Sequence, residues 1–120
     1  TKKNVPLLES RILIMGFTFK ENCADIRNTR VIDIIEELEN FGCQIHVYDP
    51  MADQNLVSRD YGINLIPNPV ENSYDAIVLS VNHSIFYELG IEKIREFGKK
   101  NHIIFDVKYM FSKDEVDGRL

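Results

Sequence analysis

The chain has 120 residues, of which 44% are hydrophobic and 28% charged, and its formal net charge is −5. This length predicts one domain with one core, and ordinary apolar content with a small net charge excludes an intrinsically disordered chain. The longest apolar runs fall far short of the roughly 20 residues that a membrane-spanning helix needs. The acidic balance argues against nucleic-acid binding, which requires a basic face.

The cysteines and the first residues of the chain bear on its cellular compartment and on whether it is part of a longer protein. Cys23 and Cys43 are too few for a disulfide scaffold and lack the spacing of zinc ligands. No basic segment followed by an apolar one resembles a secretory signal, so we expect a cytoplasmic protein. The chain begins with a polar lead-in, Thr1 to Asn4, and we expect it to be a segment of a longer protein.

Apolar, β-branched runs alternate with segments of helical periodicity. Arg11 to Met15 is almost continuously apolar, as in a strand buried on both faces. Thr29 to Phe41 is predicted to be a helix because apolar residues recur there every three or four positions. Asn28 would cap the start of this helix, and Gly42 would end it in the left-handed conformation.

The remaining elements continue the alternation. Gln44 to Tyr48 alternates polar and apolar residues, so we place this strand nearer an edge of the sheet. The other expected elements are a helix at Met51–Arg59, an edge strand at Ile63–Ile66, a strand at Ala76–Val81, helical segments at Ser84–Leu89 and Ile91–Phe97 (one helix broken near Gly90 or two short ones) and a strand at His102–Val107.

Strands that alternate with helices imply right-handed crossovers and a parallel sheet. The predicted fold is α/β: a Rossmann-like three-layer sandwich with a mostly parallel sheet of about five strands, in a single domain over residues 1–120. In such sheets ligands bind at the carboxyl ends of the strands. The loops that follow the strands are therefore the place to look for a site.

The loop from Gly16 to Arg30 carries the main signal. It has one glycine, whereas a dinucleotide-binding loop is short and has three, so NAD binding by this domain alone is not expected. Cations beside the start of a helix, where backbone N–H groups are free, favour a phosphate. Alternatively, these cations are solvent-exposed and paired with acidic residues of the same loop. The cations are Lys20, Arg27 and Arg30, and the acidic residues are Glu21 and Asp25.

Three further residues at this edge each have two interpretations. Asp49, which precedes Pro50, either binds a ribose hydroxyl or initiates a turn, and we favour the turn. His83 either contacts a ligand or bonds to backbone at the start of a helix. Lys108 either converges with Lys20 on one anion or is simply exposed.

No catalytic or metal-binding constellation is visible. Cys23 has no evident base partner, so we do not expect it to be a nucleophile, and Cys43 is expected to be buried. His46 and His102 form no ligand cluster with His83, which leaves metal binding without support. The motifs of serine hydrolases, zinc peptidases and Walker-type nucleotide-binding proteins are absent from the sequence. Taken alone, the chain is predicted to bind rather than to catalyse.

The loop after the first strand and four later segments carry a resemblance to a known family. Gly16–Lys20, Asp25–Thr29, Val47–Pro50, Val81–Phe86 and Ile104–Lys108 closely resemble the C-terminal domain of the UDP-glucose/GDP-mannose dehydrogenase family. The resemblance covers essentially the whole chain. The tripeptide Glu21-Asn22-Cys23 and the run from Arg27 to Val31 are most similar to the branch that oxidises UDP-N-acetylhexosamines.

The resemblance implies an activity of a parent enzyme and partners for this chain. Members of the family oxidise the C6 alcohol of a nucleotide sugar to the carboxylate with two NAD, held mainly by an N-terminal domain absent here. Their catalytic cysteine belongs to a central dimerisation region that is also absent. The implied partners are therefore a UDP-sugar and the other domains of a homo-oligomeric parent. The fragment alone is expected to be inactive.

The resemblance also implies residue roles. Phe19 and Lys20 are similar to a pair that contacts the nucleotide sugar, and Lys108 falls where many members have an arginine that contacts substrate. Arg27 is similar to an arginine that reaches the NAD of another domain. No catalytic residue and no metal ligand is implied in this chain.

Two alternative functions are open to a domain of this fold. A receiver-like regulatory domain needs an acidic pair after the first strand, and Met15-Gly16-Phe17 offers none. A stand-alone Rossmann-like nucleotide-binding domain is disfavoured by the missing glycines. The fold does not separate these functions, because one fold hosts many, whereas the site residues do.

Overall fold

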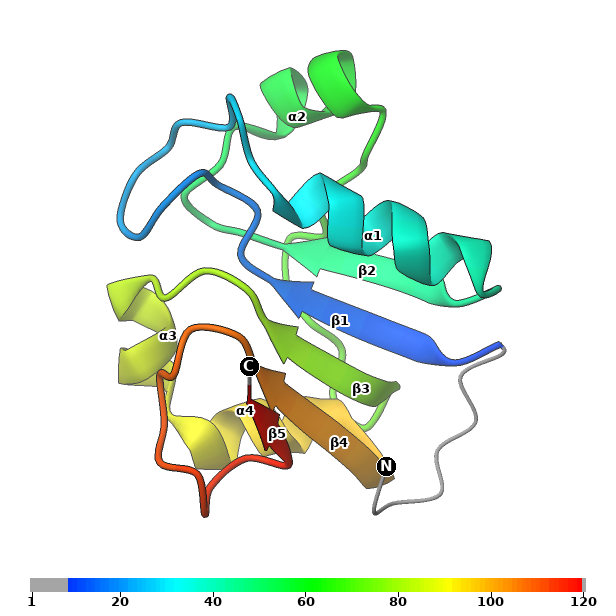
Figure 1. The fold of residues 1–120 in the computed structure, drawn as a ribbon, viewed down its shortest axis with the longest axis vertical. Coiled ribbons are helices and arrows are strands. Elements are labelled where there is room, and N and C mark those ends of the chain that lie inside the picture. Colours follow the sequence, from blue (N-terminus) through cyan, green and yellow to red (C-terminus); the bar gives the residue numbers. More distant parts are fainter. Residues whose placement is uncertain (1–8, 120) are drawn as a thin grey trace.

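The computed structural model describes residues 9–119, and the polar lead-in Thr1 to Asn4 lies outside the described residues. Five parallel strands form one sheet in the order β2-β1-β3-β4-β5, and their carboxyl ends meet at one edge, on the left of Figure 1. The elements are β1 (Arg11–Met15), α1 (Val31–Asn40), β2 (Gln44–Tyr48), α2 (Gln54–Tyr61), β3 (Tyr74–Leu79), α3 (Ser84–Leu89), α4 (Ile91–Phe97), β4 (Gly98–Asp106) and β5 (Gly118–Arg119).

Two hydrophobic clusters lie on opposite faces of the sheet and make three layers. Ile12 and Ile14 of β1 pack in the cluster that contains the buried faces of α1 and α2, whereas Leu13 and Met15 pack in the cluster of α3 and α4. All four side chains are at most 2% exposed, because neighbouring residues of a strand point to opposite faces. Figure 1 shows α1 in front of the sheet and α4 behind it. The predicted α/β sandwich is confirmed.

The start of α1 differs from the sequence prediction. The helix begins at Val31, and Asn28 has a left-handed φ of +60° instead of capping it. Thr29 takes over: its hydroxyl accepts from the Val31 amide at 3.2 Å and donates to the Phe17 carbonyl at 2.6 Å. The Asn28 cap was wrong because a tertiary contact to Phe17 fixes the chain one residue later. Gly42 has the predicted positive φ, at +87°.

The predicted edge strand at Ile63–Ile66 is also wrong. This segment makes one isolated bridge between Val47 and Leu65, with a backbone hydrogen bond to β2 from the Ile66 amide to the Val47 carbonyl at 2.9 Å. The fifth strand is instead β5, at the other edge of the sheet beside β4. Two residues are too few to show any periodicity, and only the pairing with β4 defines this strand.

Short turns set the other boundaries. α2 begins at Gln54, rather than at Met51 as predicted, because the Asp53 side chain accepts from the amides of Asn55 and Leu56. Gly90, at φ +84°, separates α3 from α4, so the two-helix alternative is correct. Within residues 9–119, every helix is too short or too polar to cross a bilayer.

Candidate functional site

Four loops gather where the parallel strands end. They span residues 16–30 after β1, 49–53 after β2, 80–83 after β3 and 107–117 after β4, and Figure 1 shows them along one side of the molecule. The first, which we call the β1–α1 loop, carries the cations singled out in the sequence. Its backbone is held by residues of the other loops.

Asp49 is the centre of a buried polar network and is 3% exposed. Its Oδ2 accepts from the amides of Phe17 at 2.6 Å and Thr18 at 3.0 Å, and its Oδ1 accepts from the Met51 amide at 2.8 Å. Burial raises the pKa of this carboxyl group, but hydrogen bonds from His83 and the two loop amides outweigh burial and hold the pKa below its usual value. Asp49 thus forms the predicted turn and also fixes the β1–α1 loop.

His83 completes the network, with a side chain that is 0% exposed. Its Nε2 lies 3.0 Å from Oδ2 of Asp49, and its Nδ1 accepts from the Asn22 amide at 2.9 Å. An amide can only donate, so Nδ1 carries no proton and the neutral ring is protonated on Nε2. His83 therefore bonds to loop backbone, which is one of the two roles expected for it.

The β1–α1 loop exposes three residues between these fixed points, Phe19, Lys20 and Glu21, of which the first two are the predicted ligand contacts. Phe19 is 52% exposed, and Lys20 is exposed and makes no ion pair with any residue in the range 9–119. The Lys20 carbonyl accepts from the Thr18 hydroxyl at 3.0 Å, so its backbone is fixed while its ammonium remains available. For Lys20 the alternative of a loop charge paired with Glu21 does not hold.

Arg27, by contrast, is paired within the loop. Its Nε and Nη2 lie 3.0 Å from the two carboxylate oxygens of Asp25. The guanidinium lowers the pKa of Asp25 to about 2, and the carboxylate raises that of Arg27. The arginine side chain is 84% exposed, and an exposed pair of this kind contributes little to stability. The guanidinium can therefore exchange Asp25 for another anion.

Lys108 follows β4 and is exposed, whereas the β1–α1 loop follows β1, with β3 between them. Two strand spacings separate the ends of β1 and β4 by about 10 Å. Helix α3 contacts both loops: the Ser84 hydroxyl accepts from the Asn22 side chain at 2.9 Å, and the rings of Tyr87 and Phe111 lie 5.9 Å apart. Lys20 and Lys108 share one edge of the sheet but stand on different loops.

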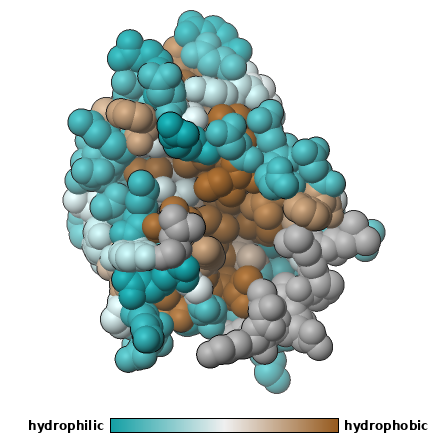
Figure 2. All heavy atoms as spheres, in the orientation of Figure 1, coloured by the Kyte–Doolittle hydropathy of each residue, from teal (hydrophilic) through white to brown (hydrophobic). Residues whose placement is uncertain are grey.

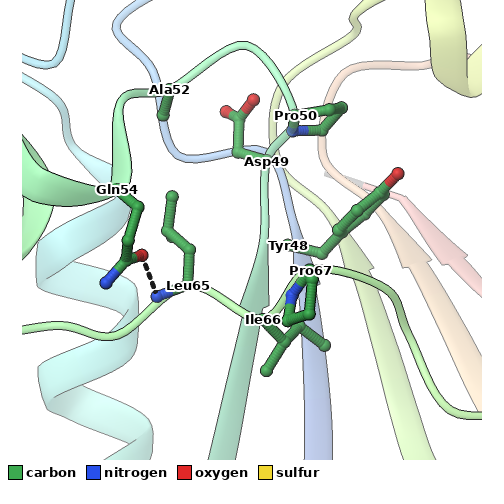
Figure 3. A pocket seen from close by; sticks show the side chains of 8 residues that line it. All are labelled: Tyr48, Asp49, Pro50, Ala52, Gln54, Leu65, Ile66 and Pro67. Carbon is green, nitrogen blue, oxygen red and sulfur yellow. Dashed lines mark hydrogen bonds between the residues drawn. The ribbon is translucent and has the colours of Figure 1, made fainter.

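A pocket of about 380 Å³ lies at the carboxyl end of β2 (Figure 3). Its lining includes Pro50, Ala52 and Leu65, and the Leu65 amide donates to the Gln54 side chain at 2.6 Å. A dinucleotide fold offers an acid here for a ribose hydroxyl, but both carboxylate oxygens of Asp49 are already engaged. With one glycine in the β1–α1 loop as well, these residues do not fit NAD as its main binding site.

The remaining candidate residues do not come together into one site in the described part of the chain. Cys43 is 7% exposed, as predicted, and burial raises the pKa of its thiol. Cys23 is half-buried and accepts a backbone amide at 3.5 Å. His46 bonds to the hydroxyl of Tyr74 at 2.7 Å. Among residues 9–119 there is no group of three histidine, cysteine or acidic side chains that could hold a metal ion.

Sequence reasoning missed the residues that hold the loop in place. Thr18, Asn22 and Ser84 are polar and common in loops, so their type gives no signal. The one available signal was positional: Asp49 directly follows β2, His83 lies in the short loop after β3, and the carboxyl ends of these strands meet at the same edge.

The low pKa of Asp49 predicts acid sensitivity. Because the folded-state pKa lies below the usual 3.8, the carboxylate contributes its full stabilisation above that value, and the contribution is lost as pH falls through the folded-state pKa. The free energy of unfolding, measured with urea, should therefore fall as the solution is acidified below about pH 4. The Asp49→Asn variant should show a shallower fall. An equally steep fall in that variant would assign the acid sensitivity to other carboxyl groups.

Comparison with known proteins gives this site a context. The family model described as "UDP-glucose/GDP-mannose dehydrogenase family, UDP binding domain" matches residues 13–113. The UDP-N-acetyl-D-glucosamine 6-dehydrogenases of Salmonella typhi and Pseudomonas aeruginosa are 44% and 42% identical over 119 residues, which is 99% of this chain. This chain spans only 28% of the length of either relative.

A solved structure agrees with these sequences. The NDP-N-acetyl-D-galactosaminuronic acid dehydrogenase from Methanosarcina mazei Go1 superposes with a TM-score of 0.76 at 26% identity, over 91% of this chain and 22% of that one. The match to the family model extends from β1 into the loop after β4, and so includes the first three loops at the carboxyl edge and residues 107–113 of the fourth. On this match, the chain belongs to the UDP-glucose/GDP-mannose dehydrogenase family and corresponds to its UDP-binding domain.

Proposed function

We propose that this chain supplies the UDP-sugar contact of a longer, NAD-dependent enzyme that oxidises the C6 alcohol of a UDP-sugar to the carboxylate. UDP-N-acetylhexosamine and UDP-glucose are the substrates we consider, and the names of the Salmonella typhi and Pseudomonas aeruginosa relatives favour the former. The observation that carries the proposal is Lys20, a cation without an ion pair among residues 9–119, on a loop whose backbone is fixed on both sides. Such a cation offsets the charge of a diphosphate and orients it.

Three side chains contact the nucleotide sugar in this proposal. Lys20 binds a phosphate, Phe19 beside it covers an apolar part of the ligand, and Lys108 approaches from the loop after β4. A lysine acts as a point charge and cannot make the two-pronged contact of an arginine. Lys108 therefore contributes attraction rather than orientation.

NAD is the cofactor of the proposed parent, and the rest of that protein holds it. This chain contributes Arg27, whose exposed pair with Asp25 is exchanged for an anionic group of the cofactor. No catalytic residue and no metal ligand is assigned to this chain. On its own it has no dehydrogenase activity in this proposal, because hydride transfer requires substrate and cofactor to be held against each other.

The parent is proposed to be a homo-oligomer in the cytoplasm, in which the remaining domains close over the edge of the sheet described here. The relatives are more than three times as long as the aligned part of this chain, which leaves room for such domains. The alternatives of a receiver-like or stand-alone nucleotide-binding domain are not favoured, since the family match covers the first three site loops and residues 107–113 of the fourth.

The test is an NMR titration of the isotope-labelled chain with UDP, GDP and NAD in parallel. UDP should shift the amide signals of Phe19, Lys20 and Lys108, and GDP should shift them less at equal concentration. NAD alone should leave these signals in place. Shifts caused by NAD alone around Gly16 would contradict the proposal and favour a cofactor-binding domain.

A further inference from the structure

The β1–α1 loop is fixed by two buried side chains, one on each side of Phe19 and Lys20. The carboxylate of Asp49 accepts a hydrogen bond from the amide of Thr18, which precedes Phe19 and Lys20. The imidazole of His83 accepts one from the amide of Asn22, which follows them. Both side chains are 0% exposed, and they bond to each other at 3.0 Å. Neither bonds to Lys20, so neither is part of the proposed ligand contact.

We propose that His83 is a positioning residue for nucleotide-sugar binding. Oriented by Asp49, its ring fixes the backbone that carries Phe19 and Lys20 in the conformation that receives the diphosphate. This inference rests on the proposed function, because it assumes that Lys20 contacts the ligand. It adds that the affinity depends on a residue that does not touch the ligand.

The position requires a group that donates and accepts at the same time. Nε2–H donates to Asp49, while Nδ1 on the other side of the ring accepts from the Asn22 amide. Neutral imidazole provides both functions in one rigid ring. Glutamine can replace the donor toward Asp49 and asparagine the acceptor toward Asn22, but neither replaces both. The substitutions His83→Gln and His83→Asn therefore test the hydrogen bonds to Asn22 and to Asp49 separately.

The effect on binding comes from the β1–α1 loop being ordered in the ligand-free protein. Only Phe19, Lys20 and Glu21 lie between the fixed amides of Thr18 and Asn22. Immobilising a loop on binding weakens the affinity, and a loop that is already ordered avoids this cost. Losing the acceptor for Asn22 frees one side of the segment.

A second contact limits the size of the effect. The Asn22 side chain accepts from the Ser84 amide at 2.8 Å and donates to the Ser84 hydroxyl at 2.9 Å. Removing the His83 acceptor therefore loosens the loop without releasing it. We expect a loss of UDP affinity of roughly tenfold in His83→Gln, which corresponds to ordering one or two residues on binding.

The experiment measures two quantities on the whole 120-residue chain: the dissociation constant of UDP and the hydrogen-exchange rate of the Asn22 amide. In the wild type this amide should exchange slowly with and without UDP. His83→Gln should accelerate its exchange and weaken UDP about tenfold. His83→Asn, which keeps the acceptor, should preserve slow exchange and most of the affinity.

A matched control distinguishes positioning from general destabilisation. His102 is also buried, donates from Nδ1 to the Lys99 carbonyl at 2.6 Å and is bonded at Nε2 to Arg95 at 3.1 Å, but it precedes Ile103, which pairs with Ala76 near the start of β3, away from the carboxyl edge. His102→Gln should destabilise the fold and leave UDP binding unchanged. An equal loss of affinity in both variants would overturn the positioning role.

The outcomes also separate this inference from the proposed function. Faster exchange of Asn22 in His83→Gln with unchanged UDP affinity would overturn the inference and leave the proposed function intact. Fast exchange of Asn22 in the wild type without UDP would overturn the inference even if the variants did not fold. Unchanged UDP affinity in Lys20→Ala, or no UDP binding by the wild type, would overturn the proposed contact and with it the inference.

Discussion

Lys20→Ala is expected to weaken the binding of UDP by roughly ten- to a hundredfold, the range of one charge-assisted hydrogen bond to a phosphate. The residue is exposed and has no ion pair among residues 9–119, so its removal leaves no buried group without a partner. The free energy of unfolding should therefore stay the same within about 0.5 kcal/mol. Isothermal titration calorimetry with UDP and urea denaturation measure the two quantities.

Lys100→Ala is the matched control for this substitution. Lys100 is an exposed lysine near the start of β4, away from the carboxyl ends of the strands. Its removal changes the net charge by the same amount and should leave UDP affinity unchanged. If both variants lose affinity equally, the attraction comes from net charge, and Lys20 has no specific contact.

Gly16→Ala is expected to lower the free energy of unfolding by about 3 kcal/mol. Gly16 follows β1 with φ at +105°, where a side chain strains the backbone. A Cβ there would lie 2.6 Å from Cβ of Val81 and 2.7 Å from its backbone nitrogen. Val81 is 2% exposed and follows β3, so the overlap is relieved only if the loops after β1 and β3 move apart.

Gly62→Ala separates the two contributions to this loss. Gly62 ends α2 at φ +70°, and a Cβ there would meet no atom within 4 Å. This variant carries backbone strain without overlap, and should cost about 1 kcal/mol. Urea denaturation of both variants checks the difference. Equal losses of unfolding free energy in the two variants would mean that the overlap with Val81 adds no cost, because the loops after β1 and β3 adjust.

Much of the fold was predictable because its signals are local. The continuous apolar run at Arg11–Met15 marks a strand buried on both faces, and the periodicity ahead of Gly42 marks α1. The fifth strand was not predictable. Gly118 and Arg119 are a strand only because β4 lies beside them, whereas Ile63–Ile66 has a strand-like composition but makes a single bridge.

The candidate site, like the fold, was predictable only where its signals are local. The cations of the β1–α1 loop could be found from the sequence, because charge and the absence of a glycine triplet are properties of residue types in order. Which cation is available was decided by the conformation of the folded loop: Arg27 folds back on Asp25, and Lys20 has no such partner among residues 9–119. Sequence alone left that choice open, since both acidic residues lie within a few positions of each cation.

By itself, then, the sequence determined the α/β class, the central strands, the edge of the sheet where ligands are expected and the family resemblance. Only the tertiary structure decided the role of Asp49 and His83, which lie 34 residues apart and bond to each other and to a third loop. Residue type specifies what a polar group can donate or accept. Its partner is chosen when the chain folds, because a buried donor or acceptor must pair with whatever group the packing of the strands brings within reach.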